Sequence, residues 1–232
     1  LCDSELKQIN QYMKSRSVES LFTSPEMKEE KNRLALTILS TLMPATYLHN
    51  SELWNFIVLK SINSLLRDGI SDQVYSLSGY GIILCSVYKD YKTGHAFALL
   101  ALKIAERYQN KSEITKTANV VANYTLPFRE HLKNAAELNR KCLEVGKESG
   151  EFQHLSYSLV FNILNLFYTS KNISSILNDV IPTHMLLCKQ AKSSLGKDTI
   201  NAVRIIILSM TTSPEDNMEI EVINEYAQKF LN

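Results

Sequence analysis

Two cysteine–histidine pairs are the residues of this sequence best suited to chemistry. Cys85 stands shortly before His95, and a cysteine becomes a nucleophile when a neighbouring base takes up its proton. His184 and Cys188 stand at positions i and i+4, so on a helix they share one face and could offer ligands to zinc. A zinc site needs further ligands, and none lies near in the sequence. Because both pairs fall in apolar helical segments, we expect these side chains to pack in a core.

Acidic residues also cluster in three places, in "KEEK" (28–31), in "SPED" (213–216) and in "EIEVINE" (219–225). The first two clusters open predicted helices, where carboxylates favour the positive end of the helix dipole. In the third, Glu219, Glu221 and Glu225 are typical of a solvated face. The histidines outside the two pairs fall near predicted helix ends, where we expect contact with solvent or the helix terminus: His49, His131 and His154.

The sequence lacks the short motifs of nucleotide and kinase chemistry. It has no GxxxxGK[ST] phosphate loop, and it has no HRD or DFG signature. We therefore predict that this chain is not an enzyme and that it has no catalytic, cofactor-binding or metal-binding residues.

Composition narrows the classes of partner. The 232 residues include 25 basic and 24 acidic side chains, a formal net charge of +1, and the basic ones are dispersed. Such a balance predicts no nucleic-acid partner. No apolar run approaches the length of a membrane span. The four cysteines lie far apart, which favours reduced thiols and a cytoplasmic location. The first residue is Leu1 rather than methionine, so we expect a piece of a longer protein.

Helix signals cover nearly the whole chain, while glycine (7) and proline (5) are scarce. Ser24 and Pro25 should open a helix that Pro44 ends or kinks, with Leu34, Ile38 and Leu42 on its apolar stripe and Leu36, Leu39 and Met43 widening that stripe. A second helix should run from Asn50 to Gly69, with its buried stripe at Trp54, Ile57, Val58, Ile62 and Leu65. The other predicted helices cover residues 3–14, 72–88, 93–109, 112–126, 131–148, 152–169, 174–193, 198–211 and 215–231, with Gly150 and Gly196 as punctuation.

Small residues repeat at an offset of 41. Gly94, Ala98, Ala101 and Ala105 share one helix face, and they align with Ala135, Asn139, Cys142 and Gly146. Gly81 aligns in the same way with Ala122. We expect helices of one hairpin to approach closely along these small side chains. A non-repetitive bundle in which the spacing is coincidental remains the alternative.

From residue 69 to residue 107 the sequence resembles the tetratricopeptide-like helical-repeat segment of large bacterial signalling kinases. The residues that carry the resemblance are Pro44, Tyr47, Leu59, Lys60, Tyr80, Gly81, Leu84, Cys85, Asp90, Gly94, Phe97, Leu100, Ala101 and Leu102. The looser similarity covers about residues 30–195. In that family a kinase-like head and an AAA-type ATPase precede the segment, and GAF and histidine-kinase modules follow it. The resemblance implies a non-catalytic scaffold inside a multidomain regulator.

We therefore predict an all-α protein, a right-handed superhelix of antiparallel helical hairpins with about ten helices. We expect residues 1–24 to form an N-terminal helix and linker, and residues 25–232 to form a single helical-repeat domain. The predicted function is protein interaction or regulation in a bacterial signal-transduction protein. The partner would be a peptide, another protein or a neighbouring domain, and some tyrosines could line its groove. The alternative is a sensing domain that binds a small molecule between hairpins.

Overall fold

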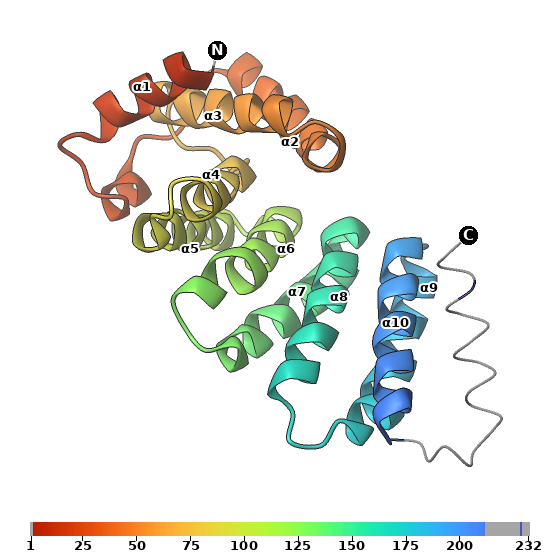
Figure 1. The fold of residues 1–232 in the computed structure, drawn as a ribbon. Helices are drawn as coiled ribbons and strands as arrows, with labels where there is room; N and C mark the ends of the chain where they lie inside the picture. Colours follow the sequence, from red (N-terminus) through yellow and green to blue (C-terminus); the bar gives the residue numbers. More distant parts are fainter. Residues whose placement is uncertain (1, 212–227, 229–232) are drawn as a thin grey trace. The chain divides into compact units, whose positions relative to one another are not determined.

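The computed structural model describes residues 2–211 and 228, and within them it is all-α, as predicted (Figure 1). The only pairing of strand type among these residues is an isolated bridge between Glu26 and Ile70. The contacts divide the chain into two compact units, Leu1–His154 and Leu155–Asn232. Residues 2–24, which the sequence analysis set apart as a helix and linker, belong to the first unit and pack there against later helices.

The first unit is built from helices that follow one another with short connections. They are α1 (Cys2–Met13), the 3₁₀ turn η1 (Glu19–Thr23), α2 (Glu30–His49), α3 (Ser51–Asp68), α4 (Tyr75–Ser86), α5 (Tyr91–Arg107), α6 (Lys111–Val120) and α7 (Ala135–Ser149). The link from α6 to α7 contains the π-helical turn η2 (Val121–Thr125) and the 3₁₀ turns η3 (Leu126–Phe128) and η4 (Leu132–Asn134). Among the described helices, α4 with α5 and α6 with α7 make the most extensive contacts.

The second unit contains most of α8 (Phe152–Thr169), the π-helical turn η5 (Ile176–Val180), α9 (Ile181–Gln190) and α10 (Ser194–Thr211). The predicted helix at 152–169 is confirmed at both ends. Gly196 was predicted to mark a helix boundary, but it lies inside α10 and is buried. A Cβ there would stand 2.6 Å from Cys188 Sγ, so the two helices meet closely at this glycine. The predicted helix at 215–231 and its Ser213–Pro214 cap fall outside the described residues, except for Gln228.

The predicted helix start at Ser24 and Pro25 is wrong, because the backbone there pairs with a distant segment. The Met27 N–H donates to the Ile70 carbonyl at 2.8 Å, and the Ile70 N–H donates to the Pro25 carbonyl at 2.8 Å. Gly69 makes this approach possible, since its φ is +107° and a Cβ there would lie 2.7 Å from the Pro25 oxygen. The helix α2 therefore begins only at Glu30, and it continues through Pro44 to His49.

The predicted close approach of α4 and α5 is confirmed. A Cβ on Gly81 would lie 2.5 Å from the Gly94 carbonyl oxygen, and a Cβ on Gly94 would lie 2.7 Å from the Gly81 oxygen. All the small residues of the α5 stripe are buried, and the four buried residues of α7 are the aligned Ala135, Asn139, Cys142 and Gly146. The two helix pairs therefore use the same face for packing, as the repeat predicted.

The core of the first unit centres on α3, α4 and α5. The predicted α3 stripe is confirmed, since each of its residues is at most 6% exposed: Trp54, Ile57, Val58, Ile62 and Leu65. The helix begins at an Asn50 cap, whose side chain accepts from the Leu53 N–H at 3.0 Å. On its other side Asn63 donates to the buried carboxylate of Glu5 at 2.6 Å, which holds α1 against α3.

Candidate functional site

Cys85 and His95 do not form a nucleophile–base pair. The sulfur of Cys85 faces Gly94, and burial raises the pKa of the thiol to about 11. At neutral pH this thiol is protonated and is a poor nucleophile. The His95 ring bonds instead to the hydroxyl of Thr125 at 2.9 Å, and burial lowers its pKa. Each side chain thus has a packing role in the α4–α5 hairpin.

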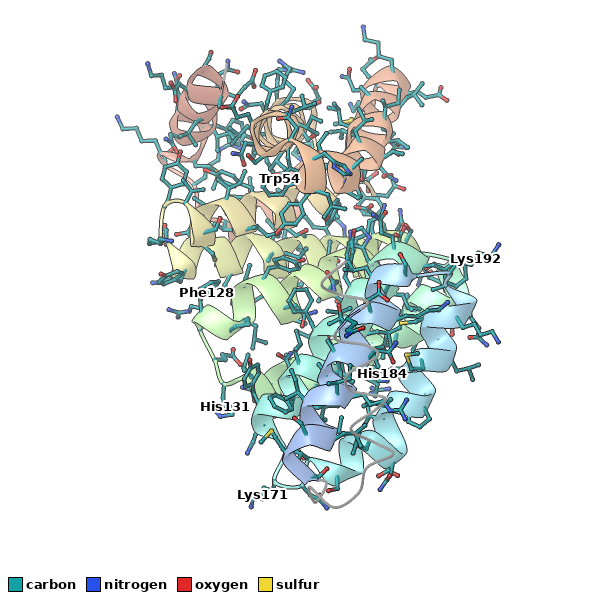
Figure 2. All side chains as sticks on the ribbon, turned by 45° about the vertical axis from the view of Figure 1, so that its right-hand side comes forward. Trp54, Phe128, His131, Lys171, His184 and Lys192 are labelled. Atoms are coloured by element: carbon teal, nitrogen blue, oxygen red, sulfur yellow. The ribbon has the colours of Figure 1, made fainter. Side chains whose placement is uncertain are left out.

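His184 and Cys188 lie on the same helix, α9, and both are buried. His184 is labelled in Figure 2; its Nε2 atom bonds to Asn162 Oδ1 at 3.0 Å, and burial lowers the pKa of the imidazole to about 4. Burial also raises the pKa of the Cys188 thiol to about 11, while its sulfur faces Gly196. Within residues 2–211 and 228, no group of three or more potential ligands is placed to hold a metal ion.

The other predicted histidine and carboxylate positions fall into three groups. His49 and His131 stand at helix ends as expected, and the His131 ring accepts from the Lys133 N–H at 3.2 Å. In "KEEK", Glu29 occupies the N-cap position and Glu30 the first turn of α2. The prediction for His154 is wrong, since this side chain is only 1% exposed. The acidic residues of 213–225 lie outside the described residues.

A buried carboxylate, Glu113, joins α6 to the start of α4. Glu113 is 1% exposed, and its Oε2 accepts from the backbone N–H groups of Val74 at 2.8 Å and Tyr75 at 2.6 Å. Its other oxygen pairs with Lys116 Nζ at 3.0 Å. A carboxylate at a helix N-terminus satisfies free N–H groups and meets the positive end of the dipole. Glu113 is thus the cap of α4, supplied by another helix.

The same polar network continues to a histidine and a tyrosine. Glu151 Oε1 lies 3.0 Å from His154 Nδ1, and His154 Nε2 lies 3.1 Å from the Tyr75 hydroxyl. A carboxylate only accepts, so His154 Nδ1 carries the proton that Glu151 accepts. Burial tends to raise the pKa of Glu151, but hydrogen bonds from His154 and Ser112 and the charge of Lys116 bring it below its usual value.

This network has the order of an acid–base relay, carboxylate to imidazole to phenol. Its outer member, Tyr75, is however only 8% exposed, and its ring packs edge-on against His154 with centroids 5.1 Å apart. A relay needs a substrate within reach of its last oxygen. The geometry therefore favours a network that fastens α4, α6 and the start of α8 within the first unit.

The sequence analysis missed Glu113, Lys116 and Glu151, although a local signal was present. Glu113 with Lys116 and Glu151 with His154 are both i, i+3 pairs, which lie on one helix face. What joins the two pairs is tertiary packing. Lys116 Nζ also lies 3.9 Å from Glu151, and Ser112 donates to that carboxylate at 3.0 Å.

An exposed apolar surface of the first unit runs along α2, and here the predicted stripe is buried only at its widening residues Leu36 and Met43. Leu34, Ile38 and Leu42, which we name the α2 stripe, are 59%, 54% and 46% exposed. The face of α2 that packs on the core instead contains Leu36 and Met43, at 2% and 1%. Large apolar residues in a row on a helix surface mark interaction sites.

The tyrosines do not form one surface. Tyr75 and Tyr80 are buried, and burial raises the pKa of Tyr80 to about 12. Tyr88 is 52% exposed, and Tyr91 stacks on the half-exposed ring of Phe128 with centroids 4.9 Å apart (Figure 2). The hydroxyl of Tyr75 bonds to His154.

No protein-family model matches this sequence, and neither curated proteins nor solved structures give a significant match. The resemblance to bacterial signalling kinases therefore stays a prediction. In the part of the chain that the structure describes, none of the helices is long and apolar enough to cross a membrane.

Proposed function

We propose that this chain is a non-catalytic scaffold domain of a cytoplasmic bacterial signalling protein and that it binds a partner through the α2 stripe. The single observation that carries the proposal is the exposure of Leu34, Ile38 and Leu42 at i, i+4 and i+8 on one helix. The resemblance supports the signalling context. The stacking of α4–α5 and α6–α7 in chain order supports a superhelix of hairpins, which typically presents long binding surfaces.

The shape of the stripe selects the kind of partner. Three large side chains, each one turn after the last, match the apolar face of another helix, which packs by ridges into grooves. Such a contact excludes water from both faces. We therefore propose that the partner presents an amphipathic helix.

The charged residues of α2 indicate which residues should flank the apolar face of the partner helix. After Glu30, the helix contains Lys31, Arg33 and His49 and no acidic residue. Lys31 is exposed and forms no ion pair among the residues that the structure describes. The helix that binds here should therefore have carboxylates beside its apolar face.

Site-specific photo-crosslinking in the full-length protein tests this proposal. A photoreactive phenylalanine analogue replaces Leu42 in the stripe or, as a control, the exposed Lys147 on α7. We expect position 42 alone to crosslink, and mass spectrometry should map the product to an amphipathic helix with acidic flanks. Ile38→Asp should abolish that product. It should leave the free energy of unfolding unchanged within about 0.5 kcal/mol, because position 38 is exposed.

Two results would overturn the proposal. One is crosslinking from position 42 that equals the control or survives Ile38→Asp. The other is a product that maps to a second copy of this chain or to a segment without an apolar helical face. For the signalling context, a full-length gene without a kinase-like, ATPase, GAF or other signalling module would contradict the resemblance.

A further inference from the structure

An apolar hollow lies in the first unit, between η1 and the outer face of α5. Its volume is about 330 Å³. The residues that line it are Val18, Glu19, Phe22, Ala96, Leu99, Leu100 and Lys103, and we name this hollow the η1–α5 groove. At about 30 Å³ per water molecule, the groove has room for roughly ten non-hydrogen atoms.

The wall of the groove on the η1 side is held in place from α5. Arg107 Nη1 donates to the Phe22 carbonyl at 2.6 Å. The same guanidinium lies 5.0 Å from the centre of the Phe22 ring and 4.9 Å from that of Tyr108. A cation over an aromatic face is attracted to it. Phe22 is thus fixed before any ligand enters, which lowers the entropic cost of binding.

The charges at the groove are unequal. Lys103 is exposed and has no ion-pair partner among residues 2–211, and Lys92 lies on the same face of α5, about 16 Å away at 1.5 Å per residue. The opposing charge is Glu19, which also lines the groove, and its pKa is lowered by its own backbone N–H, by Ser17 and by the charges of Lys103 and Lys92. Lys103 and Glu19 balance each other in the lining, and Lys92 adds a second cation near Glu19 outside it, so the charge beside the apolar floor favours a ligand with an apolar body and a negative head.

We propose that the η1–α5 groove binds a small amphipathic carboxylate, with its apolar chain on Ala96, Leu99 and Phe22 and its carboxylate at Lys103. This site goes beyond the proposed scaffold function, and it does not involve the α2 stripe. It lies beside α5 rather than between two hairpins. The volume of about 330 Å³ matches a single short chain better than a two-chain lipid.

Calorimetric titration of the full chain with sodium octanoate tests the site, because octanoate has about ten non-hydrogen atoms. We expect one molecule to bind per chain. Lys103→Ala should weaken binding about tenfold, since it removes a charge-assisted contact, whereas Lys147→Ala should have no effect. Glu19→Gln should tighten binding two- to threefold, because it removes the like charge.

Two variants fill the groove from opposite walls, so the test does not depend on one substitution being tolerated. Ala96→Leu on α5 and Val18→Phe beside η1 should each abolish binding while circular dichroism remains that of the wild type. 1-Octanol, which lacks the charge, should bind at least tenfold more weakly than octanoate.

Several outcomes would overturn the assignment. Octanoate that does not bind saturably, or that binds equally to Ala96→Leu and Val18→Phe, would remove the site. Octanol that binds as tightly as octanoate, or unchanged affinity in Lys103→Ala, would contradict the carboxylate. An acidic apolar peptide that binds in the groove while octanoate does not would assign the groove to a protein partner instead.

Discussion

Replacing Gly94 by alanine tests the close contact between α4 and α5. The added Cβ would lie 2.6 Å from Cys85 Sγ, 2.7 Å from the Gly81 carbonyl oxygen and 3.2 Å from the Cys85 backbone nitrogen. Non-bonded atoms of this size normally stand about 3.5–4.0 Å apart. Because two of the three neighbours are backbone atoms, no side-chain rotation relieves the contact, and the helices must separate.

The expected magnitude follows from two opposing terms. Overpacking a tight interface costs about 1–3 kcal/mol, and contacts against backbone that cannot rotate away place Gly94→Ala at the upper end, about 2–3 kcal/mol, while alanine in place of glycine inside a helix stabilises by about 1 kcal/mol. We expect a net loss of about 1–2 kcal/mol in the free energy of unfolding. With a urea m-value of about 2 kcal/mol/M, the unfolding midpoint should fall by about 0.5–1 M.

Gly79→Ala is the matched control, since Gly79 lies inside α4, the other helix of the same hairpin. Its added Cβ would meet Val58 Cγ2 at 3.1 Å and Trp54 Cζ2 at 3.7 Å, which are side-chain atoms that can shift. We expect its midpoint to stay the same or rise. Urea unfolding followed by the fluorescence of Trp54, the only tryptophan, reports on the first unit. If the two variants had equal midpoints, the backbone contact would not limit the substitution.

Three further predictions concern buried polar groups. Glu113→Gln keeps an acceptor for the α4 backbone but loses the ion pair with Lys116, so urea unfolding should show a loss of about 1–3 kcal/mol, and an unchanged midpoint would mean that the buried ion pair does not stabilise the fold. In the folded chain at pH 8, Ellman's reagent should react readily only with the half-buried Cys2. The other thiols are buried, and burial raises the pKa of the Cys85 thiol to about 11. Rapid reaction of a second thiol would contradict this prediction. The His184 ring should show no NMR titration between pH 7 and pH 5, since its pKa is about 4. The unfolded chain takes up that proton near its ordinary value of 6.5, so the contribution of His184 to stability is lost as the pH falls from about 6.5 to about 4, and a ring pKa above 6 would refute the burial argument.

The helices and their closest contacts could be predicted from the sequence because both depend on local patterns. The spacing of Gly94, Ala98, Ala101 and Ala105 places them on one helix face, and only a close neighbour explains so much lost side-chain volume. The alignment with α7 then identified its buried residues. Asn139 shows how the pattern tolerates a polar member, since its amide exchanges two hydrogen bonds with that of Asn123, at 2.9 and 3.1 Å.

The polar network could not be predicted, because its partners are far apart in the sequence. Glu113 caps a helix that begins 38 residues earlier, and His154 bonds to a tyrosine 79 residues away. A local reading placed His154 at a helix end, which is correct, and inferred exposure, which is wrong. Burial at a helix end depends on which neighbouring helix covers it. The helix start predicted at Pro25 failed for the same reason, because the Pro25 carbonyl accepts from the N–H of the distant Ile70.

The error at α2 has a different cause, and it bears on function. Leu36, Ser40 and Met43 are buried, and the α2 stripe lies about 170° around the helix from them at 100° per residue. A helix that is apolar on two opposite faces gives two stripes in the sequence, and periodicity does not say which one meets the core. A helix that is apolar all round is normally covered on both sides. The described residues cover one side of α2, and so the second stripe is the strongest reason to expect a partner.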